Sequence, residues 1–468
     1  MKYFLTLIQL WVGFLSICAS YPKANIWIIP SVESPQVYRN YAQTSKVHLE
    51  MARGEVEHIQ LVFPSKVNEE YRFTFDRYLK GIQISARELK KMNGYYDALV
   101  PFKNQLKCTD TLTAVWITVQ CPSRVPVGKY HQTIKIEGSK HFTIQLDYNV
   151  HHTTIPLKSS IPITVGVENR CMTECLNDKE ADKERQRWVD FVLSYRMTPV
   201  FGTQITPERW QYEHSFSPWA WNDKRSIRLL NDRRYSCYML PFFTLSENEL
   251  ASLLCNIQKK GKLKESLFYI WDEPAYMEDY EQIKRKVNII RKYASDARIL
   301  TTFFCGPRNG PRKGDLYAVF DYLKHHIHVA TISLAPCKGN EEEVQHIRYK
   351  VPEGIDWWSY VCWQPGGNEP NFLLQMKGIQ QRAIMWRTWK NGSQGFLYWN
   401  CNIYHKRNPF TYITDMPHGD GILIYPGDIL GCKGPIASAR LERWRDGAEE
   451  MELLRLVEKN YSKEKADT

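Results

Sequence analysis

The chain has 468 residues, a hydrophobic fraction of 43%, a charged fraction of 24% and a net charge of +11. This length favours two domains, and the ordinary composition is typical of a globular protein and excludes a disordered one. The basic residues are spread along the sequence without a clustered stripe, so nothing predicts a nucleic-acid surface. Aromatic residues make up 13% of the chain, which fits either sugar-binding platforms or large cores.

Residues 1–20 are typical of a signal peptide. A basic start at Lys2 precedes an apolar run from Phe4 to Ile17, and small residues follow it. The run is short for a membrane span, and no second long apolar segment follows. We therefore expect a secreted or periplasmic protein without a stable membrane span. Lipid anchoring through Cys18 is the alternative, although isoleucine is a poor residue just before such a cysteine.

The twelve cysteines predict neither a metal site nor a defined set of disulfides. Cys171 and Cys175 have no matching second pair at zinc spacing. His325, His326 and His328 have no carboxylate or cysteine partner at ligand spacing, so a solvated turn is the better interpretation. Disulfides would suit an oxidising compartment, and buried free thiols are the alternative. We expect no metal and no cofactor.

Residues 21–155 carry short apolar or alternating runs separated by turn signals, which predicts an N-terminal β-sandwich domain. A linker is expected near Thr153–Pro156. The expected strands are Asn25–Ile29, two strands within Val47–Phe63 broken at Arg53-Gly54, Thr111–Val119, His131–Ile136 and Phe142–Val150.

Residues 156–457 alternate short apolar runs with helical stretches, which predicts a parallel sheet and, at this length, a TIM-like (β/α)8 barrel. Residues 458–468 form a C-terminal tail. The expected helices are 182–195, 247–258, 276–294, 374–389 and 437–457. The expected strands are 161–167, 238–243, 267–271, 299–304, 329–334, 357–361 and 396–399.

Two adjacent acids, Asp272 and Glu273, follow the apolar strand Leu267–Trp271 and precede Pro274. Because proline cannot continue the hydrogen-bond ladder, the strand ends there. Catalytic groups of barrel enzymes lie at the carboxyl ends of the strands. Side chains alternate along a strand, so both acids reach one site only if the backbone twists there. The alternative is structural, with Asp272 capping the next helix and Glu273 in its first turn.

Glycosidic cleavage needs a proton on the leaving oxygen and stabilisation of positive charge at the anomeric carbon. Two carboxylates on opposite sides of the bond usually share this work, and sequence neighbours cannot easily do so. In substrate-assisted hydrolysis the 2-acetamido oxygen of the substrate attacks instead. One acid then orients the acetamide N–H while the other moves the proton, which suits an adjacent pair. The proton donor would need a raised pKa, which burial beside Trp271 or other aromatics could supply.

The block Trp271-Asp272-Glu273-Pro274 resembles the signature of glycoside hydrolase family 123 and its related family of uncharacterised domains. Further blocks resemble that family in the same order along nearly the whole mature chain. They are Arg53-Gly54-Glu55, Pro126–Tyr130, Trp357–Cys362, the helix with Arg382, Trp386 and Trp389, Gly395–Trp399, Gly419-Asp420-Gly421, Tyr425-Pro426-Gly427, Arg440-Leu441-Glu442 and Arg445-Asp446-Gly447.

The resemblance implies an exo-acting β-N-acetylgalactosaminidase that uses substrate-assisted, retaining hydrolysis. Asp272 would orient the acetamido group and Glu273 would be the general acid/base. The implied substrate-binding residues are Trp271, Trp358, Tyr360, Arg382, Trp386, Tyr398 and Trp399. Arg382 could instead buttress the barrel.

Several features stay open at this stage. The strand Ile332-Ser333-Leu334 lacks the Asp and Trp that relatives often carry, so the choice between GalNAc and GlcNAc is undecided. The expected partner is a glycan on a glycolipid, glycoprotein or polysaccharide. Two alternatives remain: a glycosidase acting on a non-acetamido sugar through a remote second carboxylate, and a catalytically silent glycan-binding protein on the same fold.

Overall fold

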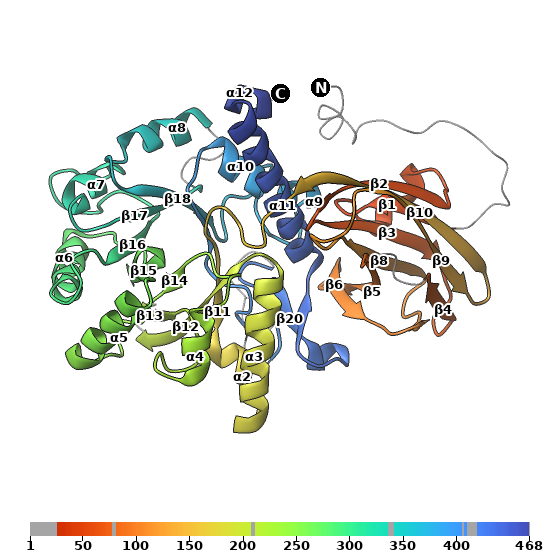
Figure 1. Cartoon of the computed structure of the whole chain (residues 1–468), viewed down its shortest axis with the longest axis horizontal. Helices are drawn as coiled ribbons and strands as arrows, with labels where there is room; N and C mark the ends of the chain where they lie inside the picture. The colour runs from red at the N-terminus through yellow and green to blue at the C-terminus, as the bar shows by residue number, and fades with distance from the viewer. Residues whose placement is uncertain are drawn as a thin grey trace. The chain divides into compact units, whose positions relative to one another are not determined.

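The computed structural model describes residues 26–76, 81–206, 211–335, 341–404, 407–409 and 419–467. The predicted signal peptide lies outside these ranges. The chain divides into two compact units (Figure 1). The first comprises the described residues up to Pro156 together with Lys377–Ile379, and the second comprises Leu157–Met376 and the residues from Gln380 onward.

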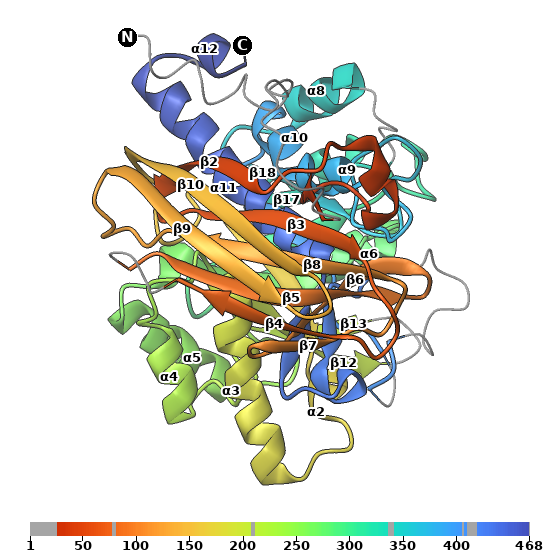
Figure 2. The same cartoon turned by 90° about the vertical axis from the view of Figure 1, so that its right-hand side faces the viewer.

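The first unit consists of two five-stranded sheets that share one apolar core (Figure 2). Leu61 and Ile117 of one sheet belong to the same core as Ile134 and Leu146 of the other. One sheet has the order β1 (Trp27–Pro30), β3 (Val56–Pro64), β8 (Leu112–Gln120), β5 (Gln83–Met92) and β6 (Tyr95–Pro101). The other has the order β2 (Lys46–Arg53), β10 (His141–Thr154), β9 (Gly128–Glu137), β4 (Glu70–Phe75) and β7 (Gln105–Lys107).

The expected break between β2 and β3 is present at Gly54. This residue has a φ of 87°, in the left-handed region that favours glycine. Its N–H donates to the Cys121 carbonyl oxygen at 2.7 Å. The glycine therefore allows the chain to pass from one sheet to the other within a few residues.

The second unit is built on a nine-stranded sheet in which only β13 runs antiparallel to its neighbour. Its order is β13 (Gln211–Ser215), β12 (Thr198–Thr206), β11 (Ile163–Glu168), β19 (Phe396–Tyr398), β18 (Asp356–Val361), β17 (Val329–Ser333), β16 (Arg298–Phe303), β15 (Ser266–Trp271) and β14 (Tyr238–Met239). Just beyond β13, the Phe216 N–H donates to the Met239 carbonyl oxygen of β14 at 2.6 Å. The sheet is therefore nearly barrel-shaped.

The prediction of a regular (β/α)8 barrel needs correction. In the part of the chain that the structure describes, β12 is followed by an antiparallel partner, β13, and not by a helix. The strand β13 thus stands between the parallel strands β12 and β14, which do not pair with each other. The predicted combination of strands and helices is present, but the sheet is a nearly closed barrel interrupted by one antiparallel strand.

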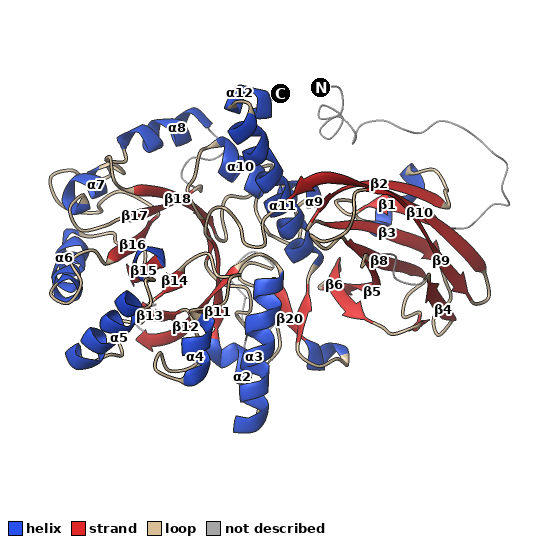
Figure 3. Ribbon diagram, viewed as in Figure 1, coloured by secondary structure: helices blue, strands red, loops and turns tan. Residues whose placement is uncertain are grey.

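Helices α4 to α8 lie on the outer side of these strands (Figure 3). The predicted helix over 374–389 is two short helices, α9 and α10, with Ala383 between them. The helices are α2 (Asn169–Thr173), α3 (Asp178–Ser194), α4 (Lys224–Leu229), α5 (Glu247–Lys259), α6 (Met277–Arg291), α7 (Ala318–Leu323), α8 (Glu341–Lys350), α9 (Gly378–Arg382), α10 (Ile384–Lys390), α11 (Ala439–Asn460) and α12 (Lys463–Asp467). The remaining described elements are the short 3-10 helices η1 (Pro35–Asn40), η3 (Leu263–Glu265) and η4 (Gly427–Leu430) and the antiparallel strand pair β20 (Ile424–Pro426) and β21 (Pro435–Ala437).

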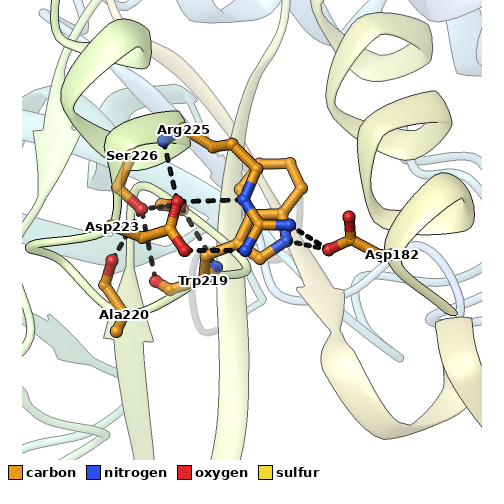
Figure 4. A network of polar contacts seen from close by, with 7 residues as sticks. Asp182, Trp219, Ala220, Asp223, Arg225 and Ser226 are labelled. Atoms are coloured by element: carbon orange, nitrogen blue, oxygen red, sulfur yellow. Dashed lines mark hydrogen bonds and ion pairs between the residues drawn. The ribbon is translucent and has the colours of Figure 1, made fainter. Parts of the chain in front are cut away.

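A polar network joins the short helix α4 to the long helix α3 (Figure 4). Asp223 caps α4, and its carboxylate binds the Arg225 guanidinium. That guanidinium also pairs with Asp182 of α3 and lies 4.6 Å from the centre of the Trp219 ring. The Trp219 indole N–H donates to the same Asp182 oxygen at 2.7 Å. The network therefore holds the segment after β13 against α3.

Helix α11 is buried along most of its length although it carries many charged residues. Arg445 pairs with Glu442, which also accepts a hydrogen bond from the Tyr195 hydroxyl at 2.7 Å. Arg440 donates to the carbonyl oxygens of Phe372 and Gly419, each at 2.7 Å. Buried charges are tolerated when they are paired or hydrogen-bonded, and each of the charged groups named here has such a partner.

Three further features of the described ranges are the cysteines, the potential metal ligands and the apolarity of the helices. The cysteines there are all unpaired, many of them buried. No group of His, Cys, Asp and Glu in the same ranges has an arrangement that could hold a metal ion. None of the helices that the structure describes is both long and apolar enough to cross a bilayer.

Candidate active site

The inner face of the nine-stranded sheet is lined by alternate residues of the parallel strands. Leu267 and Tyr269 of β15 belong to the same apolar cluster as Trp358 and Tyr360 of β18. Because side chains alternate along a strand, a single set of positions on each strand faces inward. The cluster therefore brings aromatic side chains of separate strands to one side of the sheet, at the end where Asp272 and Glu273 follow β15.

The backbone leaves regular strand geometry where the two acids begin. The pairing of β15 with β16 shifts by one residue between Tyr269 and Trp271, and Glu273 has a φ of 44°. A left-handed conformation costs a non-glycine residue about 1–2 kcal/mol, so the surrounding contacts must hold it in place. The backbone thus makes the turn that both acids need in order to reach the same site.

One oxygen of Asp272 is fixed by two hydroxyl groups. The Tyr269 hydroxyl donates to Oδ1 at 2.7 Å, and the Thr302 hydroxyl donates to it at 2.8 Å. The Tyr269 ring stacks on the half-buried His214 ring, with 4.2 Å between ring centres and 18° between planes. Burial lowers the pKa of His214 to about 4, so it packs as a neutral ring. Asp272 Oδ2 has no hydrogen-bond partner among the described residues and is an available acceptor.

Glu273 lies beside Asp272 and is held at both its backbone and its side chain. Its N–H donates to Thr302 Oγ1 at 2.9 Å, and Oε1 accepts a hydrogen bond from the Tyr360 hydroxyl. Burial and, to a lesser extent, the negative charge of Asp272 raise the pKa of Glu273 to about 7, although the Tyr360 hydroxyl and Arg308 oppose the rise.

Glu273 is nevertheless exposed to solvent. Protein atoms surround much of this carboxyl group, yet solvent still reaches it. Such a group can exchange a proton with a bound molecule.

The structural alternative, in which the acids cap the next helix, is wrong. Helix α6 begins at Met277, and Asp279 supplies its cap. The Asp279 carboxylate accepts from the N–H groups of Ala275 and Tyr276, each at 2.9 Å. Asp272 and Glu273 are therefore not needed to begin the helix.

Of the aromatic residues expected around the pair, Tyr360 is the one with a hydrogen bond to it among the described residues. The Trp271 ring lies 5.5 Å from Lys286 Nζ of α6, so it contacts the helix that follows β15. The Trp358 ring is buried against Gly395, where a Cβ atom would approach it to 2.3 Å. Trp358 therefore contributes to the core beneath the site.

Tyr398 and Trp399 converge on a different acid, Asp420. The Tyr398 hydroxyl and the Trp399 indole N–H each donate to Asp420 Oδ1 at 3.0 Å. Tyr398 is fully buried, whereas Trp399 is half-buried and packs against the inner cluster. Burial raises the pKa of Asp420 to about 6. Trp399 is thus the one of the two that remains partly accessible to a ligand.

Arg382 and Trp386 both bind Glu450 of α11. The Arg382 Nε–H and the Trp386 indole N–H donate to Glu450 Oε2 at 2.9 and 2.7 Å. Arg382 also lies 3.5 Å from the carboxylate of Asp446. These contacts support the buttressing role for Arg382, and a role of either residue in substrate binding stays a prediction.

The sequence reasoning did not single out Tyr269, Thr302, His214 or Asp420 as members of a site. A signal was present for three of them, since Asp420 stands in the block Gly419-Asp420-Gly421 that resembles the family. Tyr269 occupies the inward register two residues before the strand terminus, and Thr302 is a polar residue near the end of an apolar strand. The contribution of His214 depends on the unforeseen strand β13.

Two further acids lie at or near the carboxyl ends of the parallel strands, and both are buried. Glu168 ends β11, and burial raises its pKa to about 7. Neither Glu168 Oε2 nor Asp420 Oδ2 has a hydrogen-bond partner or meaningful solvent exposure within the described ranges. These two oxygens are shielded from solvent, whereas Asp272 and Glu273 are both exposed.

Comparison with known proteins identifies the fold and the family. The model of the family described as "Glycoside hydrolase 123, catalytic domain" matches residues 183–457, more than half of the chain. A solved family 123 glycoside hydrolase from Clostridium perfringens is 14% identical and covers 94% of this chain and 90% of its own, with a TM-score of 0.65. That likeness shows the same fold.

Other solved glycosidases align more loosely. A GH5 xyloglucanase from Bacteroides ovatus is 10% identical, covers 86% of this chain and 98% of its own, and has a TM-score of 0.29. A GH2 β-galacturonidase from Eisenbergiella tayi is 8% identical, covers 85% and 90%, and has a TM-score of 0.37. Scores this low support no conclusion. No curated protein matches the sequence.

Proposed function

Because this chain belongs to glycoside hydrolase family 123, we propose that it releases a terminal β-linked N-acetylhexosamine, with GalNAc as the expected sugar, by substrate-assisted retaining hydrolysis. Family membership makes it a glycosidase that acts on glycans. The observation that supports the finer assignment is the pairing of two adjacent acids with different surroundings. Asp272 has one oxygen fixed and one available, and Glu273 has a pKa raised to about 7.

The first chemical step uses both acids at once. The acetamido oxygen of the substrate attacks the anomeric carbon while the bond to the leaving oxygen breaks. Glu273 gives its proton to that leaving oxygen. Asp272 Oδ2 accepts the acetamide N–H and stabilises the positive charge that develops on the cyclised oxazoline ring. An ionised acceptor suits this task because charge-assisted hydrogen bonds are stronger than neutral ones.

The second step restores the enzyme. Glu273, now ionised, takes a proton from a water molecule that attacks the anomeric carbon on the face the leaving group vacated. The bond to the acetamido oxygen breaks, and the sugar leaves with its original configuration. One group serves as acid and then as base, so its ideal pKa lies near the working pH. A pKa of about 7 for Glu273 meets that requirement.

The adjacent position of the acids is the reason to prefer this mechanism over the usual pair. Retaining and inverting glycosidases with two protein carboxylates place them on opposite sides of the bond, roughly 5 to 9.5 Å apart. Glu168 and Asp420, two further acids near the strand ends, are buried. A substrate that carries its own nucleophile removes the need for a second carboxylate across the site.

We also propose that the enzyme is exported and acts on glycans of glycolipids, glycoproteins or polysaccharides outside the cytoplasm. The support is the sequence of residues 1–20, with its basic start, short apolar run and small residues. N-terminal sequencing of the protein purified from culture medium or periplasm tests this. A mature N-terminus near residue 20 is the expected result, and an intact Met1 would contradict it.

The assay for the enzymatic proposal compares chromogenic β-GalNAc, β-GlcNAc and β-galactoside substrates, with Glu273→Gln and Asp272→Asn as variants. We expect turnover confined to the acetamido sugars. Each variant should lower kcat by about 10²–10⁴-fold, the usual contribution of a positioned acid or base. Turnover of plain galactosides would instead favour a remote second carboxylate. Glycan binding without turnover would favour a silent binding protein.

A further inference from the structure

Thr302 of β16 places a single hydroxyl group between the two acids. Its Oγ1 donates to Asp272 Oδ1 at 2.8 Å and accepts from the Glu273 N–H at 2.9 Å. It also lies 3.0 Å from the Tyr269 hydroxyl oxygen. Thr302 is 1% exposed, so water does not compete for these contacts. One side chain therefore contacts the carboxylate of one acid and the backbone of the other.

The protons of this cluster can be assigned from its acceptors. A hydroxyl group has one proton, and an ionised carboxylate oxygen can accept two hydrogen bonds. The Tyr269 and Thr302 hydroxyls both reach Asp272 Oδ1, and each gains most by donating to the charged oxygen. The Thr302 oxygen then keeps a lone pair for the Glu273 N–H. All three bonds can exist together, and they fix the rotamer that leaves Asp272 Oδ2 available.

The same hydroxyl restrains the unusual backbone of Glu273. The φ of 44° is a conformation that L-residues rarely adopt, and the N–H of this residue is bound to Thr302 Oγ1. Without that bond, the segment can relax toward extended geometry, in which neighbouring side chains point to opposite faces. The two carboxylates would then no longer meet the same sugar.

We propose that Thr302 is a positioning residue whose hydroxyl sets both Asp272 and Glu273 toward one substrate. This inference rests on the proposed function, because it explains how adjacent acids can share one acetamido sugar. Thr302 Oγ1 would thus be the atom that keeps both carboxylates on one side of the strand. Thr301, the preceding residue of β16, provides a matched control.

The test uses three variants of the full chain. Thr302→Val keeps the shape and removes the hydroxyl, and Thr302→Ser keeps the hydroxyl. Thr301→Val is the matched control, because Thr301 is the preceding residue of β16, is fully buried, and has a hydroxyl without a hydrogen-bond partner among the described residues. Circular dichroism checks folding. Thr302→Ala replaces the valine variant if that one does not fold.

For Thr302→Val we expect kcat on a chromogenic β-GalNAc substrate to fall about 10²-fold with little change in KM, the scale of loss expected from a small misplacement of catalytic groups. Thr302→Ser should recover most of the activity, and Thr301→Val should match the wild type. A valine variant at position 302 as active as the control would overturn the proposal. A serine variant as impaired as the valine variant would do the same, because shape and not the hydroxyl would then matter.

The pH profile supplies a readout that a purely structural residue would not change. The charged or titratable groups that act on Glu273 are Asp272, Tyr360 and Arg308, and Asp272 raises its pKa. If Thr302→Val lets Asp272 move away, the pKa of Glu273 falls and the alkaline limb of kcat/KM moves to lower pH. An unchanged limb would overturn the proposal.

Failure of this inference is separable from failure of the proposed function. Glu273→Gln tests the function without touching Thr302. A glutamine variant that is inactive beside a fully active Thr302→Val enzyme would refute only the positioning role. A glutamine variant with wild-type activity would refute the function itself.

Discussion

Replacing Tyr360 with phenylalanine removes the hydroxyl that donates to Glu273 Oε1 while leaving the buried ring in place. This hydrogen bond favours the ionised form of Glu273 and therefore lowers its pKa. Without it the carboxyl group holds its proton to higher pH. The alkaline limb of kcat/KM, which reports the acid form of the free enzyme, should move to higher pH.

The size of the change in the pKa of Glu273 follows from the strength of the hydrogen bond that is lost. A hydrogen bond to a charged group contributes about 1.5–3 kcal/mol. At 1.36 kcal/mol per pKa unit this corresponds to roughly one to two units. Solvent reaches Glu273, and screening reduces the effect, so we expect a shift of about one unit. The limb near pH 7 in the wild type should therefore lie near pH ~8 in the variant.

The assay measures kcat/KM for a chromogenic β-GalNAc substrate from pH 4 to pH 10. Because the two carboxylates interact, the fitted values belong to the pair. Tyr404→Phe is the control, since Tyr404 is fully buried and its hydroxyl lacks a hydrogen-bond partner among the described residues. An alkaline limb that stays in place or moves to lower pH in Tyr360→Phe would refute the assignment of Glu273 as the acid.

Three further outcomes are expected. Arg308→Met removes a cation that lowers the pKa of Glu273, so the alkaline limb of kcat/KM should move to higher pH; an unmoved limb contradicts this. The folded-state pKa of Asp420 is raised to about 6, so its contribution to stability is complete below its unfolded pKa and is lost as pH rises through 6. Asp420→Asn should flatten the denaturation midpoint between pH ~4 and 6 relative to wild type, and parallel curves would exclude this. Gly447→Ala should lower the free energy of unfolding by about 1–3 kcal/mol in urea denaturation, because its Cβ would meet the Arg382 carbonyl oxygen at 2.2 Å; no loss would refute the packing argument.

The hydrophobic pattern predicts most of the parallel strands, because they are buried on both faces and appear as short apolar runs. It also predicts the long helices, whose apolar residues recur at helical spacing. It does not predict β13, whose sequence Gln211–Ser215 is polar. It also misses the division of 374–389 into two helices, since an apolar helical pattern continues across Ala383. Strands β4 and β5 carry many charged residues on their outward faces and give little apolar signal.

The sequence likewise predicts one part of the candidate site and not the other. The position of Asp272 and Glu273 at a strand terminus follows from the apolar run and the proline after it. The contacts that distinguish the two acids do not, because Thr302 and Tyr360 come from other strands and depend on sheet register. Sequence similarity associates Tyr398 and Trp399 with the pocket, whereas the structure directs both to the buried Asp420.

The central claim is that the substrate's own acetamido oxygen is the nucleophile and that Asp272 steadies it. The most direct test is the rate of hydrolysis of 4-nitrophenyl β-GalNAc analogues whose N-acetyl group carries zero, one, two or three fluorine atoms. Fluorine withdraws electrons and weakens the carbonyl oxygen as a nucleophile. We predict that kcat/KM falls steeply with each fluorine, whereas a flat series would contradict the claim.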